Sequence, residues 1–370
     1  MRDGVSVAIL PQLGASLAGL RQAGQFRRTL DYDLAAYQGR FDQVTWLSYA
    51  AGESRTFAEY AYPRVAVAAP RHPYPPLLWA LAASARRAAI LEASVLRVWN
   101  LSGVLPALVA RAYWGRPYVL QLGYDHLAVA RALGKWWKIP LIRALRRIAA
   151  RRADLIFVPS LALAERWGVA ADPAIRSKLM EMPNGVDTER FQPDADPEPR
   201  AKGAVLYVGR LSPEKNLLRL AEACRLIEAR LVCVGQGPLA TALAAAGSEL
   251  HGPVPNEELP GWYTAAACFA LPSLTEGSPK ALLEAMAAGC PCVVSAQIAL
   301  DFAVPGMVVP VNPALVIDIE AGIHAVRVRP PWVAEHIRSA RAHVEGHHDL
   351  RALLRREVSL VWEVAHGHHR

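Results

Sequence analysis

The sequence has no long uninterrupted run of apolar residues, although hydrophobic residues make up 53% of its 370 positions. The apolar stretch that begins at Leu77 ends at Arg86 and Arg87. No run reaches the roughly 18 to 20 residues that a membrane-spanning helix needs. The segment from Val5 to Leu10 is too short for the core of a signal peptide, and no small-residue cleavage site follows it. We therefore expect a cytoplasmic protein without a membrane span.

Cysteine is scarce, and its distribution argues against covalent or metal cross-links. The five cysteines all lie in the second half among apolar residues, and no two have C-x-x-C spacing. An odd number without that spacing fits neither a disulfide framework nor a structural zinc site. The histidines near the C-terminus lack Cys or carboxylate ligands at fixed spacing. The sequence therefore predicts buried thiols in a reducing compartment and no metal.

Acidic residues are few in the first half of the chain. Residues 1–185 carry 24 Lys and Arg against 12 Asp and Glu, whereas residues 186–370 carry 17 against 21. The net charge of +8 therefore belongs to the first half, and we expect that half to meet any anionic surface or substrate. No nucleic-acid recognition motif accompanies this charge, so the sequence does not indicate a nucleic-acid partner.

Short β-branched or aromatic segments alternate with longer helical patterns through both halves. This rhythm is typical of a parallel sheet covered by helices on both faces. The length exceeds the roughly 250 to 300 residues that one core supports, so we predict an α/β protein with two similar units. The candidate strands are Val5–Leu10, Val65–Ala68, Val95–Trp99, Tyr118–Leu122, Leu155–Val158, Val205–Val208, Leu231–Val234, Cys268–Leu271, Cys292–Ser295 and Met307–Val309.

A proline-rich stretch, residues 191–200, separates the two units, because it holds three prolines and no apolar periodicity. The pattern after residue 313 is helical, and its last candidate helix runs from Leu350 to Val364. We predict an N-terminal domain over residues 1–185, a linker over 186–200, a C-terminal domain over 201–345 and a C-terminal helical segment over 346–370.

The loop after the first strand of the second half carries two cations. Arg210 and Lys215 flank Ser212-Pro213, a pair that predicts the start of a helix. Ligands of open parallel sheets bind beyond the carboxyl ends of the strands. A guanidinium, an ammonium and helix amides together suit a diphosphate there; two solvated surface cations are the alternative. The next loop, Gly235-Gln-Gly, is weak support, because tight strand-to-helix turns need glycine sterically.

A third loop leads into a helix that is apolar nearly all round, with Ser278 and Pro279 at its expected start. Glu284 is a lone carboxylate in this buried helix. Burial of an ionised group costs several kcal/mol unless something hydrogen-bonds it. The vicinal hydroxyls of a ribose would satisfy Glu284; a backbone or Arg partner is the alternative.

Glu276 lies just before that helix, beside the amides of Gly277 and Ser278. A carboxylate at this point can accept sugar hydroxyls while the amides point at phosphate oxygens. The alternative is that Glu276 only interacts with the helix dipole.

Taken together, these elements resemble family 4 of the glycosyltransferases. The matching runs are Gly209–Asn216, Gly235–Pro238, the two glutamates with seven residues between them, and Asn-Gly-Val-Asp within Pro183–Asp187. The resemblance covers about residues 183–295 and implies a GT-B fold, two Rossmann-like domains whose parallel sheets face a central cleft. It also implies a nucleotide-sugar donor on the C-terminal domain, an acceptor on the N-terminal domain, retention of anomeric configuration and no obligatory metal or other cofactor.

The resemblance assigns roles by position. It implies that Arg210 and Lys215 hold the diphosphate, that Glu284 holds the ribose and that Glu276 contacts the donor sugar. In this family a last helix commonly crosses back to the first domain. The further donor-binding residues that it implies are Gly14, Asn184, Gly209, Gly235, Gly277, Ser278, Lys280 and Ala281.

The N-terminal half departs from the family pattern at two points. The usual Gly-Gly pair after the first strand is replaced by a loop in which Gly14 is the plausible backbone site. The usual His-Gly-x-Asp motif reads Leu122-Gly-Tyr-Asp125-His126, with Leu122 in the position of the histidine. Asp125 or the displaced His126 is the candidate for contacts from the acceptor side; a structural histidine is the alternative.

Residues 135–152 interleave Lys and Arg with Trp, Ile and Leu at helical spacing. Such a segment can lie on anionic lipid with tryptophan at the interface; an ordinary surface helix is the alternative. Together with the basic first half, it favours a glycan or lipid-linked acceptor at the inner membrane face.

We therefore predict an enzyme of polysaccharide biosynthesis, a retaining hexosyltransferase that uses a nucleotide-sugar donor such as a UDP- or GDP-sugar. A nucleotide-sugar epimerase or a non-catalytic nucleotide-sugar-binding protein of the same fold is the alternative.

Overall fold

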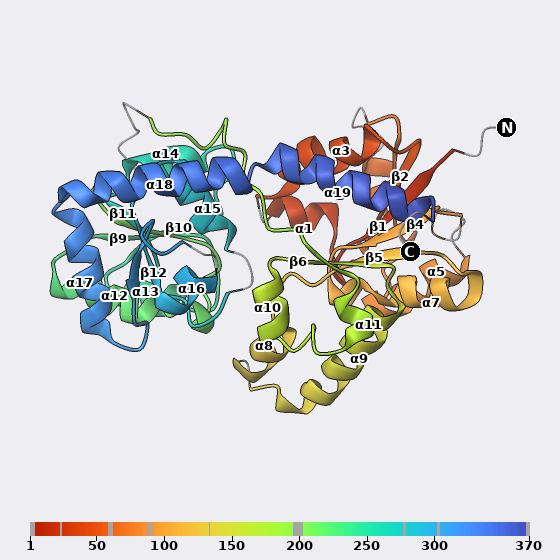
Figure 1. The fold of residues 1–370 in the computed structure, drawn as a ribbon, viewed down its shortest axis with the longest axis horizontal. Helices are drawn as coiled ribbons and strands as arrows, with labels where there is room; N and C mark the ends of the chain where they lie inside the picture. The colour runs from red at the N-terminus through yellow and green to blue at the C-terminus, as the bar shows by residue number, and fades with distance from the viewer. Residues whose placement is uncertain are drawn as a thin grey trace. The chain divides into compact units, whose positions relative to one another are not determined.

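The computed structural model describes residues 4–22, 24–57, 62–86, 90, 92–132, 134–194, 203–276, 279–301 and 304–367. Its internal contacts divide the chain into two compact units. The N-terminal unit comprises Met1–Pro183 and Leu354–Arg370, and the C-terminal unit comprises Asn184–Leu353. Each unit is a parallel sheet with helices on both faces (Figure 1). The predicted α/β class with two parallel sheets is confirmed.

The N-terminal unit contains a seven-stranded sheet in the order β3-β2-β1-β4-β5-β6-β7, and its neighbouring strands are parallel. The order reverses between β1 and β4, which is the switch point of an open α/β sheet. The strands are β1 (Ser6–Leu10), β2 (Gln43–Leu47), β3 (Val65–Ala68), β4 (Val95–Val98), β5 (Tyr118–Gln121), β6 (Leu155–Val158) and β7 (Leu179–Glu181).

Helices cover both faces of this sheet, with α1, α3 and α19 on one face and α5, α7 and α9 on the other (Figure 1). The described helices and helical turns are α1 (Leu17–Gln22), α2 (Phe26–Arg28), the π-helical η1 (Thr29–Leu34), α3 (Ala35–Gln38), α4 (Glu53–Thr56), α5 (Pro76–Arg86), η3 (Leu101–Gly103), α7 (Leu105–Trp114), α8 (His126–Ala132), η4 (Trp136–Lys138), α9 (Ile139–Arg152), α10 (Leu161–Arg166) and α11 (Pro173–Arg176).

The C-terminal unit contains a six-stranded parallel sheet in the order β10-β9-β8-β11-β12-β13, which reverses between β8 and β11. One apolar core runs through it from Val186 to Val344. The strands are β8 (Val205–Val208), β9 (Leu231–Val234), β10 (Glu249–His251), β11 (Cys268–Leu271), β12 (Cys292–Ser295) and β13 (Val309–Val311).

In this unit α12, α13 and α17 cover one face of the sheet, and α14, α15 and α18 cover the other (Figure 1). Within the described part of the chain, no helix has the length and apolar character needed to cross a bilayer. The helices and turns are η6 (Pro213–Lys215), α12 (Leu217–Leu226), α13 (Ala240–Ala245), α14 (Leu259–Ala265), α15 (Lys280–Ala287), α16 (Ala296–Asp301), α17 (Val316–Arg327), α18 (Pro331–His347) and α19 (Leu350–Ala365).

The last strand of the C-terminal unit lies two residues later than predicted. We placed it at Met307–Val309, whereas β13 covers Val309–Val311 and pairs with β12 from Val309 onward. Gly306 has a φ of 76°, and Val308 forms an isolated bridge with Pro305. The chain is therefore still turning at Met307, so the strand starts only after the turn closes.

The predicted linker overlaps the C-terminal unit. Val186 and Phe191 are buried in the core of that unit, and the ring of Phe191 packs against Tyr263 with 6.0 Å between ring centroids. Residues 195–202 lie outside the described part of the chain. Val186 precedes the proline-rich stretch of residues 191–200, and the polar composition of that stretch obscured the buried Phe191 at its start.

From Leu354 onward, α19 belongs to the N-terminal unit. Arg97 on β4 is fully buried, and its Nε lies 2.9 Å from Oε1 of Glu357 on α19. Tyr37 on α3 donates a 2.7 Å hydrogen bond to the same Glu357 oxygen. The guanidinium also donates to Gln121 at 2.7 Å and lies 4.9 Å from the Phe157 ring centroid. A buried charge network thus ties the last helix to three strands.

Candidate functional site

The candidate site lies where the strand order of the C-terminal sheet reverses. Strands β8 and β11 are parallel neighbours, so the loops that follow them leave the same edge side by side. Open α/β sheets bind their ligands in the crevice at this point. The loop after β8 carries Arg210 and Lys215, and the loop after β11 carries Glu276.

Lys215 and Glu276 form an ion pair. The Lys215 Nζ lies 2.6 Å from Oε1 of Glu276, and the two side chains are only 16% and 10% exposed. Ser273 Oγ donates to the same carboxylate oxygen at 2.8 Å. The structure therefore brings together two predicted site residues that are 61 positions apart in the sequence.

Arg210 has a different environment, because its side chain is 73% exposed and its Nη2 lies 3.9 Å from Oε1 of Glu214. Glu214 also accepts a 2.6 Å hydrogen bond from Ser212 Oγ. Burial opposes ionisation of Glu214, but the Ser212 hydrogen bond and the charges of Arg210 and Lys215 outweigh it and lower the pKa of Glu214. Most of the Arg210 guanidinium is therefore available to an incoming anion.

The helix that we expected to start at Ser212 starts later. Ser212 and Pro213 begin the short 3₁₀ turn η6, and the α-helix α12 begins at Leu217. The Ser212 hydroxyl binds the Glu214 side chain instead of a backbone amide. This prediction was wrong because Asn216 takes a left-handed conformation, with φ 60°, which ends the first turn.

Asn216 is a site residue to which sequence reasoning gave no role. Its buried Nδ2 donates to the carbonyl oxygens of Pro272 at 3.2 Å and Pro313 at 2.7 Å, while its Oδ1 accepts from Arg219 at 2.9 Å. The amide of Leu274 also donates to the Glu214 carbonyl at 2.9 Å. These bonds fix the loop after β8 against the loop after β11. Asparagine directly after the lysine was the available signal, because Asn tolerates left-handed turns.

Steric constraints explain why glycine occupies positions 209 and 235 of this site. Gly235 has φ 139°, and a Cβ built on it would lie 2.0 Å from the carbonyl oxygen of Gly209. Gly209 itself has φ 146°, and a Cβ built on it would lie 2.9 Å from the hydroxyl of Tyr207, which donates to the Arg210 carbonyl at 2.9 Å. The loops after β8 and β9 therefore pack backbone to backbone.

Glu284 is buried in α15, and its partners lie in the segment between β10 and β11. Its Oε1 accepts from Asn256 Nδ2 at 3.1 Å, and its Oε2 accepts from the Tyr263 hydroxyl at 3.0 Å. Burial, followed by the charge of Glu284, raises the pKa of Tyr263 well above its usual value. A carboxylate oxygen can accept more than one hydrogen bond, so these contacts are compatible with ribose hydroxyls.

The start of α15 is only partly described. Gly277 and Ser278, which we predicted to bind the donor, lie outside the described residues. Pro279 is the N-cap of α15 instead of its first helical residue, so Lys280 and Ala281 form the first turn. Lys280 is exposed and Ala281 is half-buried.

Asn184 lies in a different local environment from the loops after β8 and β11. Its carbonyl oxygen is 2.9 Å from Nδ1 of His348, and Val186 pairs with Asp349 in an isolated bridge. A Cβ on Gly185 would come within 2.7 Å of the Leu350 Cα. The Asn-Gly-Val-Asp element therefore packs against the junction of α18 and α19.

Gly14 lies in an exposed turn of the N-terminal unit with φ 85°. The amides that follow it, at the start of α1, donate to a buried carboxylate of the same chain. Leu17 N and Ala18 N lie 2.9 and 2.8 Å from the two carboxylate oxygens of Glu53. Sequence reasoning missed Glu53, and no local pattern marks it, because it reaches α1 from 35 residues further along the chain.

Asp125 immediately precedes α8 and His126 is its first residue, in the segment after the carboxyl end of β5. Asp125 Oδ1 accepts the Leu127 amide at 2.9 Å, and His126 Nε2 lies 3.3 Å from Oδ1 of Asn100. Burial, followed by the charge of Arg146, lowers the pKa of His126 to about 4. His126 is therefore neutral at physiological pH. Leu122 is buried and cannot replace the expected histidine at a ligand.

Among the described residues there is no group of three His, Cys, Asp or Glu side chains placed to hold a metal ion.

Comparison with known proteins shows which family the segment around this site resembles. Residues 202–326 match the model described as "Glycosyl transferases group 1". The sulfoquinovosyl transferase SQD2 of Arabidopsis thaliana is 30% identical over 43% of this chain and 34% of its own length. A GDP-mannose-dependent alpha-(1-6)-phosphatidylinositol monomannoside mannosyltransferase of Mycolicibacterium smegmatis is 33% identical over 43% of this chain and 48% of its own length. The chain thus spans between a third and a half of the length of these relatives.

Solved structures show the fold over nearly the whole chain. Sucrose-phosphate synthase from Thermosynechococcus elongatus has a TM-score of 0.80 at 18% identity and covers 98% of this chain and 100% of its own. Anabaena Alr3699/HepE, solved in complex with UDP and glucose, has a TM-score of 0.76 at 18% identity and covers 97% and 99%. Residues 202–326 thus resemble the glycosyl transferases group 1, and the chain as a whole has the GT-B fold of these solved structures.

Proposed function

We propose that this chain is a retaining glycosyltransferase that moves a hexose from a nucleotide-diphosphate sugar to a glycan or lipid-linked acceptor of envelope polysaccharide. The Lys215–Glu276 ion pair at the switch point, within the segment that matches the family model, is the observation that carries the proposal. The named relatives include a GDP-mannose-dependent mannosyltransferase and a UDP-Gal:alpha-D-GlcNAc-diphosphoundecaprenol galactosyltransferase. Their names support a nucleotide-sugar donor.

The proposed step is a transfer at the anomeric carbon. The bond from that carbon to the diphosphate oxygen breaks, and the diphosphate leaves with the electron pair. The acceptor hydroxyl oxygen forms the new bond on the same face, and its proton passes to the departing diphosphate. Positive groups aimed at the developing negative charge are the main contribution of the protein. The candidates for these positive groups are Arg210, which is exposed, and Lys215, which pairs with Glu276.

Donor binding replaces the Lys215–Glu276 ion pair with contacts to the substrate. In the structure the charge of Lys215 is balanced by Glu276. An arriving diphosphate competes for the ammonium, and this competition frees Glu276 to accept sugar hydroxyls. Donor binding thereby converts an internal ion pair into two contacts with the substrate. The buried Glu284 receives the ribose on the neighbouring helix, where Asn256 and Tyr263 hold its orientation.

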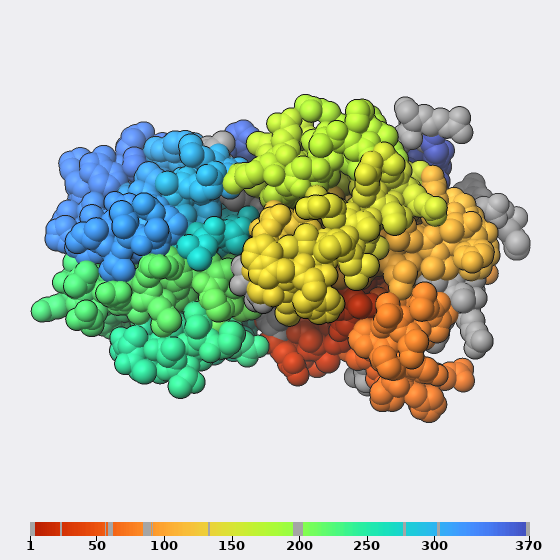
Figure 2. Space-filling view, turned by 90° about the horizontal axis from the view of Figure 1, so that it is seen from below, coloured from red at the N-terminus to blue at the C-terminus, as the bar shows by residue number. Residues whose placement is uncertain are grey.

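The N-terminal unit offers a surface suited to an anionic membrane. Trp137, beside α9, is 74% exposed, and Trp136, Leu141 and Ile148 are exposed as well. Figure 2 shows the segment from α8 to α9, in yellow, as a continuous part of the surface of this unit. Tryptophan and lysine beside an amphipathic helix suit the lipid interface. We propose that this surface brings the enzyme to a membrane-linked acceptor.

Incubation with UDP-, GDP- and ADP-sugars and a glycolipid acceptor tests the activity. The proposal expects a glycosidic product whose anomeric configuration, read by NMR, equals that of the donor. Inversion would contradict the retaining assignment. Epimer formation without acceptor would favour the epimerase. Sedimentation with anionic vesicles tests the membrane surface, and binding that does not weaken with salt would contradict it.

A further inference from the structure

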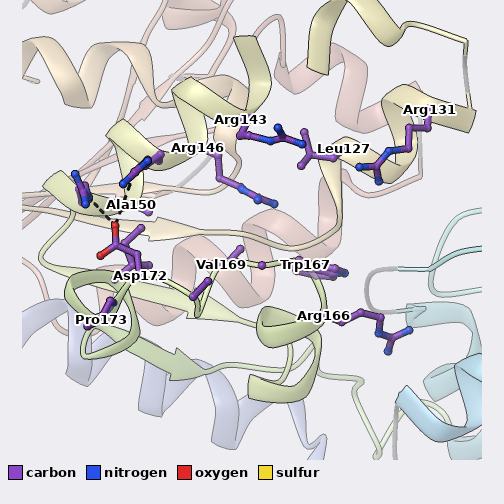
Figure 3. Close-up of a pocket in the computed structure, with 15 residues that line it drawn as sticks. Leu127, Arg131, Arg143, Arg146, Ala150, Arg166, Trp167, Val169, Asp172 and Pro173 are labelled. Atoms are coloured by element: carbon purple, nitrogen blue, oxygen red, sulfur yellow. Dashed lines mark hydrogen bonds and ion pairs between the residues drawn. The ribbon is translucent and has the colours of Figure 1, made fainter. Parts of the chain in front are cut away.

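The N-terminal unit contains a cavity of about 630 Å³ bounded by α8, α9, α10 and the segment that leads to α11 (Figure 3). Six arginines line it, whereas Asp172 is the acidic side chain among the described residues that do so. The arginines come from three helices and are Arg131, Arg143, Arg146, Arg147, Arg151 and Arg166.

Asp172 pairs with two of these arginines. Oδ2 of Asp172 lies 2.7 Å from Nε of Arg151 and 3.9 Å from Nε of Arg147, at one end of the cavity (Figure 3). Arg143 and Arg146 lie further along α9, and Arg146 extends toward Trp167 and Val169 (Figure 3). Two neighbouring guanidinium groups on the wall of one cavity repel each other, and an anion between them removes that repulsion.

The surroundings of Arg146 disfavour the positive charge of its guanidinium group. Burial, the largest effect, lowers the pKa of Arg146, and the neighbouring Arg143 lowers it further, whereas Asp125 acts in the opposite direction. Trp167 and Val169, both buried, form an apolar wall opposite. Desolvated guanidinium groups bind phosphate oxygens more strongly than exposed ones do, because less water competes.

Arg146 links one wall of the cavity to the acceptor-side residues of this unit. Arg146 is close enough to His126 for its charge to lower the pKa of that ring, and it interacts electrostatically with Asp125. His126 in turn contacts Asn100, in the loop after β4. Arg146 therefore lies near the residues that follow the carboxyl ends of β4 and β5, the edge at which open sheets bind ligands.

We propose that this cavity binds a diphosphate, or two phosphate groups close together, carried by the acceptor, and that it is a second anion site separate from the donor loops. Six forked guanidinium groups match several phosphate oxygens at once. The volume lies within the range of about 300 to 1,000 Å³ typical of small-molecule sites, so space remains for the group attached to the phosphates. The assignment to the acceptor rests on the proposed glycosyl transfer; the anion site itself does not.

Calorimetric titration with inorganic pyrophosphate tests the site at about 0.15 M salt, where contacts between exposed charges are screened. We expect the double variant Arg143→Gln/Arg146→Gln to bind at least roughly tenfold more weakly than the wild type, because it loses charged hydrogen bonds. Arg131→Gln, on α8, tests a second wall of the cavity independently. Arg152→Gln is the matched control, because Arg152 is exposed on α9 but does not line the cavity. Equal affinity in the wild type and both cavity variants, or no binding at all, overturns the proposal.

Lys215→Gln separates this site from the proposed donor site. Pyrophosphate binding that survives in Lys215→Gln and is lost in the Arg143→Gln/Arg146→Gln variant supports the cavity, whatever becomes of the glycosyltransferase proposal. Binding that is lost only in Lys215→Gln overturns the cavity and leaves the donor site standing.

Vesicles distinguish the source of the diphosphate. Phosphatidylcholine vesicles that carry a polyprenyl diphosphate are compared with vesicles in which phosphatidylglycerol supplies the same charge. Arginine-dependent binding to the first vesicles alone identifies a lipid-borne diphosphate. Binding of free pyrophosphate without preference for these vesicles identifies a diphosphate on a non-lipid acceptor. Equal, arginine-dependent binding to both vesicles, without pyrophosphate binding, overturns the diphosphate assignment.

Discussion

The two units have the same strand order around their switch points, yet they arrange charge differently. In the C-terminal unit, the loops at the switch point carry the ion pair of Lys215 and Glu276, and Asn216 bonds one loop to the next. In the N-terminal unit, the corresponding loops after β1 and β4 meet through an uncharged bond from the Leu13 amide to Ser102 Oγ at 3.2 Å. The cations of that unit gather on α8, α9 and α10 instead.

Under the proposed function, this difference assigns one ligand to each unit. A donor with a fixed diphosphate and sugar suits short loops that are held together by hydrogen bonds before the ligand arrives. An acceptor that is larger or bound to lipid suits a broad, positively charged surface that attracts it from a distance. Variants that act on one unit and spare the other therefore test the comparison.

The largest expected effect is on turnover. Arg210→Ala and Lys215→Ala should each lower kcat by about 10² to 10³-fold, because each removes a positive group aimed at the leaving diphosphate. Steady-state kinetics with the preferred donor measures this, and circular dichroism checks the fold. Arg225→Ala, exposed on α12, is the control. Wild-type turnover in a folded Arg210→Ala/Lys215→Ala protein would refute the role of the pair.

The next effect concerns stability, and it contrasts an ion pair from each unit. Arg97→Met should lower the free energy of unfolding by about 3 to 5 kcal/mol, because it leaves the largely buried Glu357 without its cation. Arg230→Met should cost less than about 1 kcal/mol, because Arg230 and Glu249 are 50% and 43% exposed. Urea unfolding measures both, and Arg97→Met/Glu357→Leu should recover much of the loss. Equal losses for Arg97→Met and Arg230→Met would show that burial of the Arg97–Glu357 pair does not matter.

The sequence predicted most of the strand framework because buried parallel strands are continuous apolar runs. Val205–Val208, Leu231–Val234 and Cys268–Leu271 match β8, β9 and β11 residue for residue. The strands β2, β7 and β10 were missed. β7 and β10 each have three residues and lie at a sheet edge, where little burial marks them, whereas β2 is an interior strand of five residues in which Gln43 and Thr45 interrupt the apolar run.

The loops of the candidate site could be predicted from the sequence, but the contacts that its residues make could not. Arg210, Lys215, Glu276 and Glu284 stand out through local motifs. Their partners come from other strands and helices, as with Tyr263, which lies 21 residues before Glu284. The arginine cavity was visible only as a basic segment, because its walls come from helices that meet in the folded unit.

A smaller effect is expected at the proposed ribose site. Glu284→Gln should weaken nucleotide binding roughly tenfold, because the ribose hydroxyls lose a charged acceptor. Tyr263→Phe should weaken it less, because Tyr263 orients the carboxylate and is not itself proposed to contact the ligand. Calorimetric titration with the nucleoside diphosphate measures both. Glu222→Gln, exposed on α12, is the control. A larger effect from Tyr263→Phe than from Glu284→Gln would contradict this order.

The smallest expected effect is a dependence of stability on pH. It arises from one histidine in each unit. The pKa of His126 and that of His343 are each lowered from 6.5 to about 4, first by burial. The unfolded chain therefore takes up protons between these values while the folded chain does not, so stability falls as the pH drops from 6.5 toward 4. His126→Gln should lose less stability than the wild type between pH 7 and pH 5 in urea unfolding. Identical losses would show that His126 ionises freely in the folded protein.

The most direct test of the division between the units is the thermal stability of three proteins in the presence of UDP-, GDP- and ADP-sugars. A ligand that binds the folded state raises Tm in proportion to its affinity. One nucleotide sugar should stabilise the wild type and the Arg143→Gln/Arg146→Gln variant alike, and it should fail to stabilise Lys215→Gln. Full stabilisation of Lys215→Gln, or its loss only in the arginine variant, would place the donor away from the loops after β8 and β11 and would contradict the account.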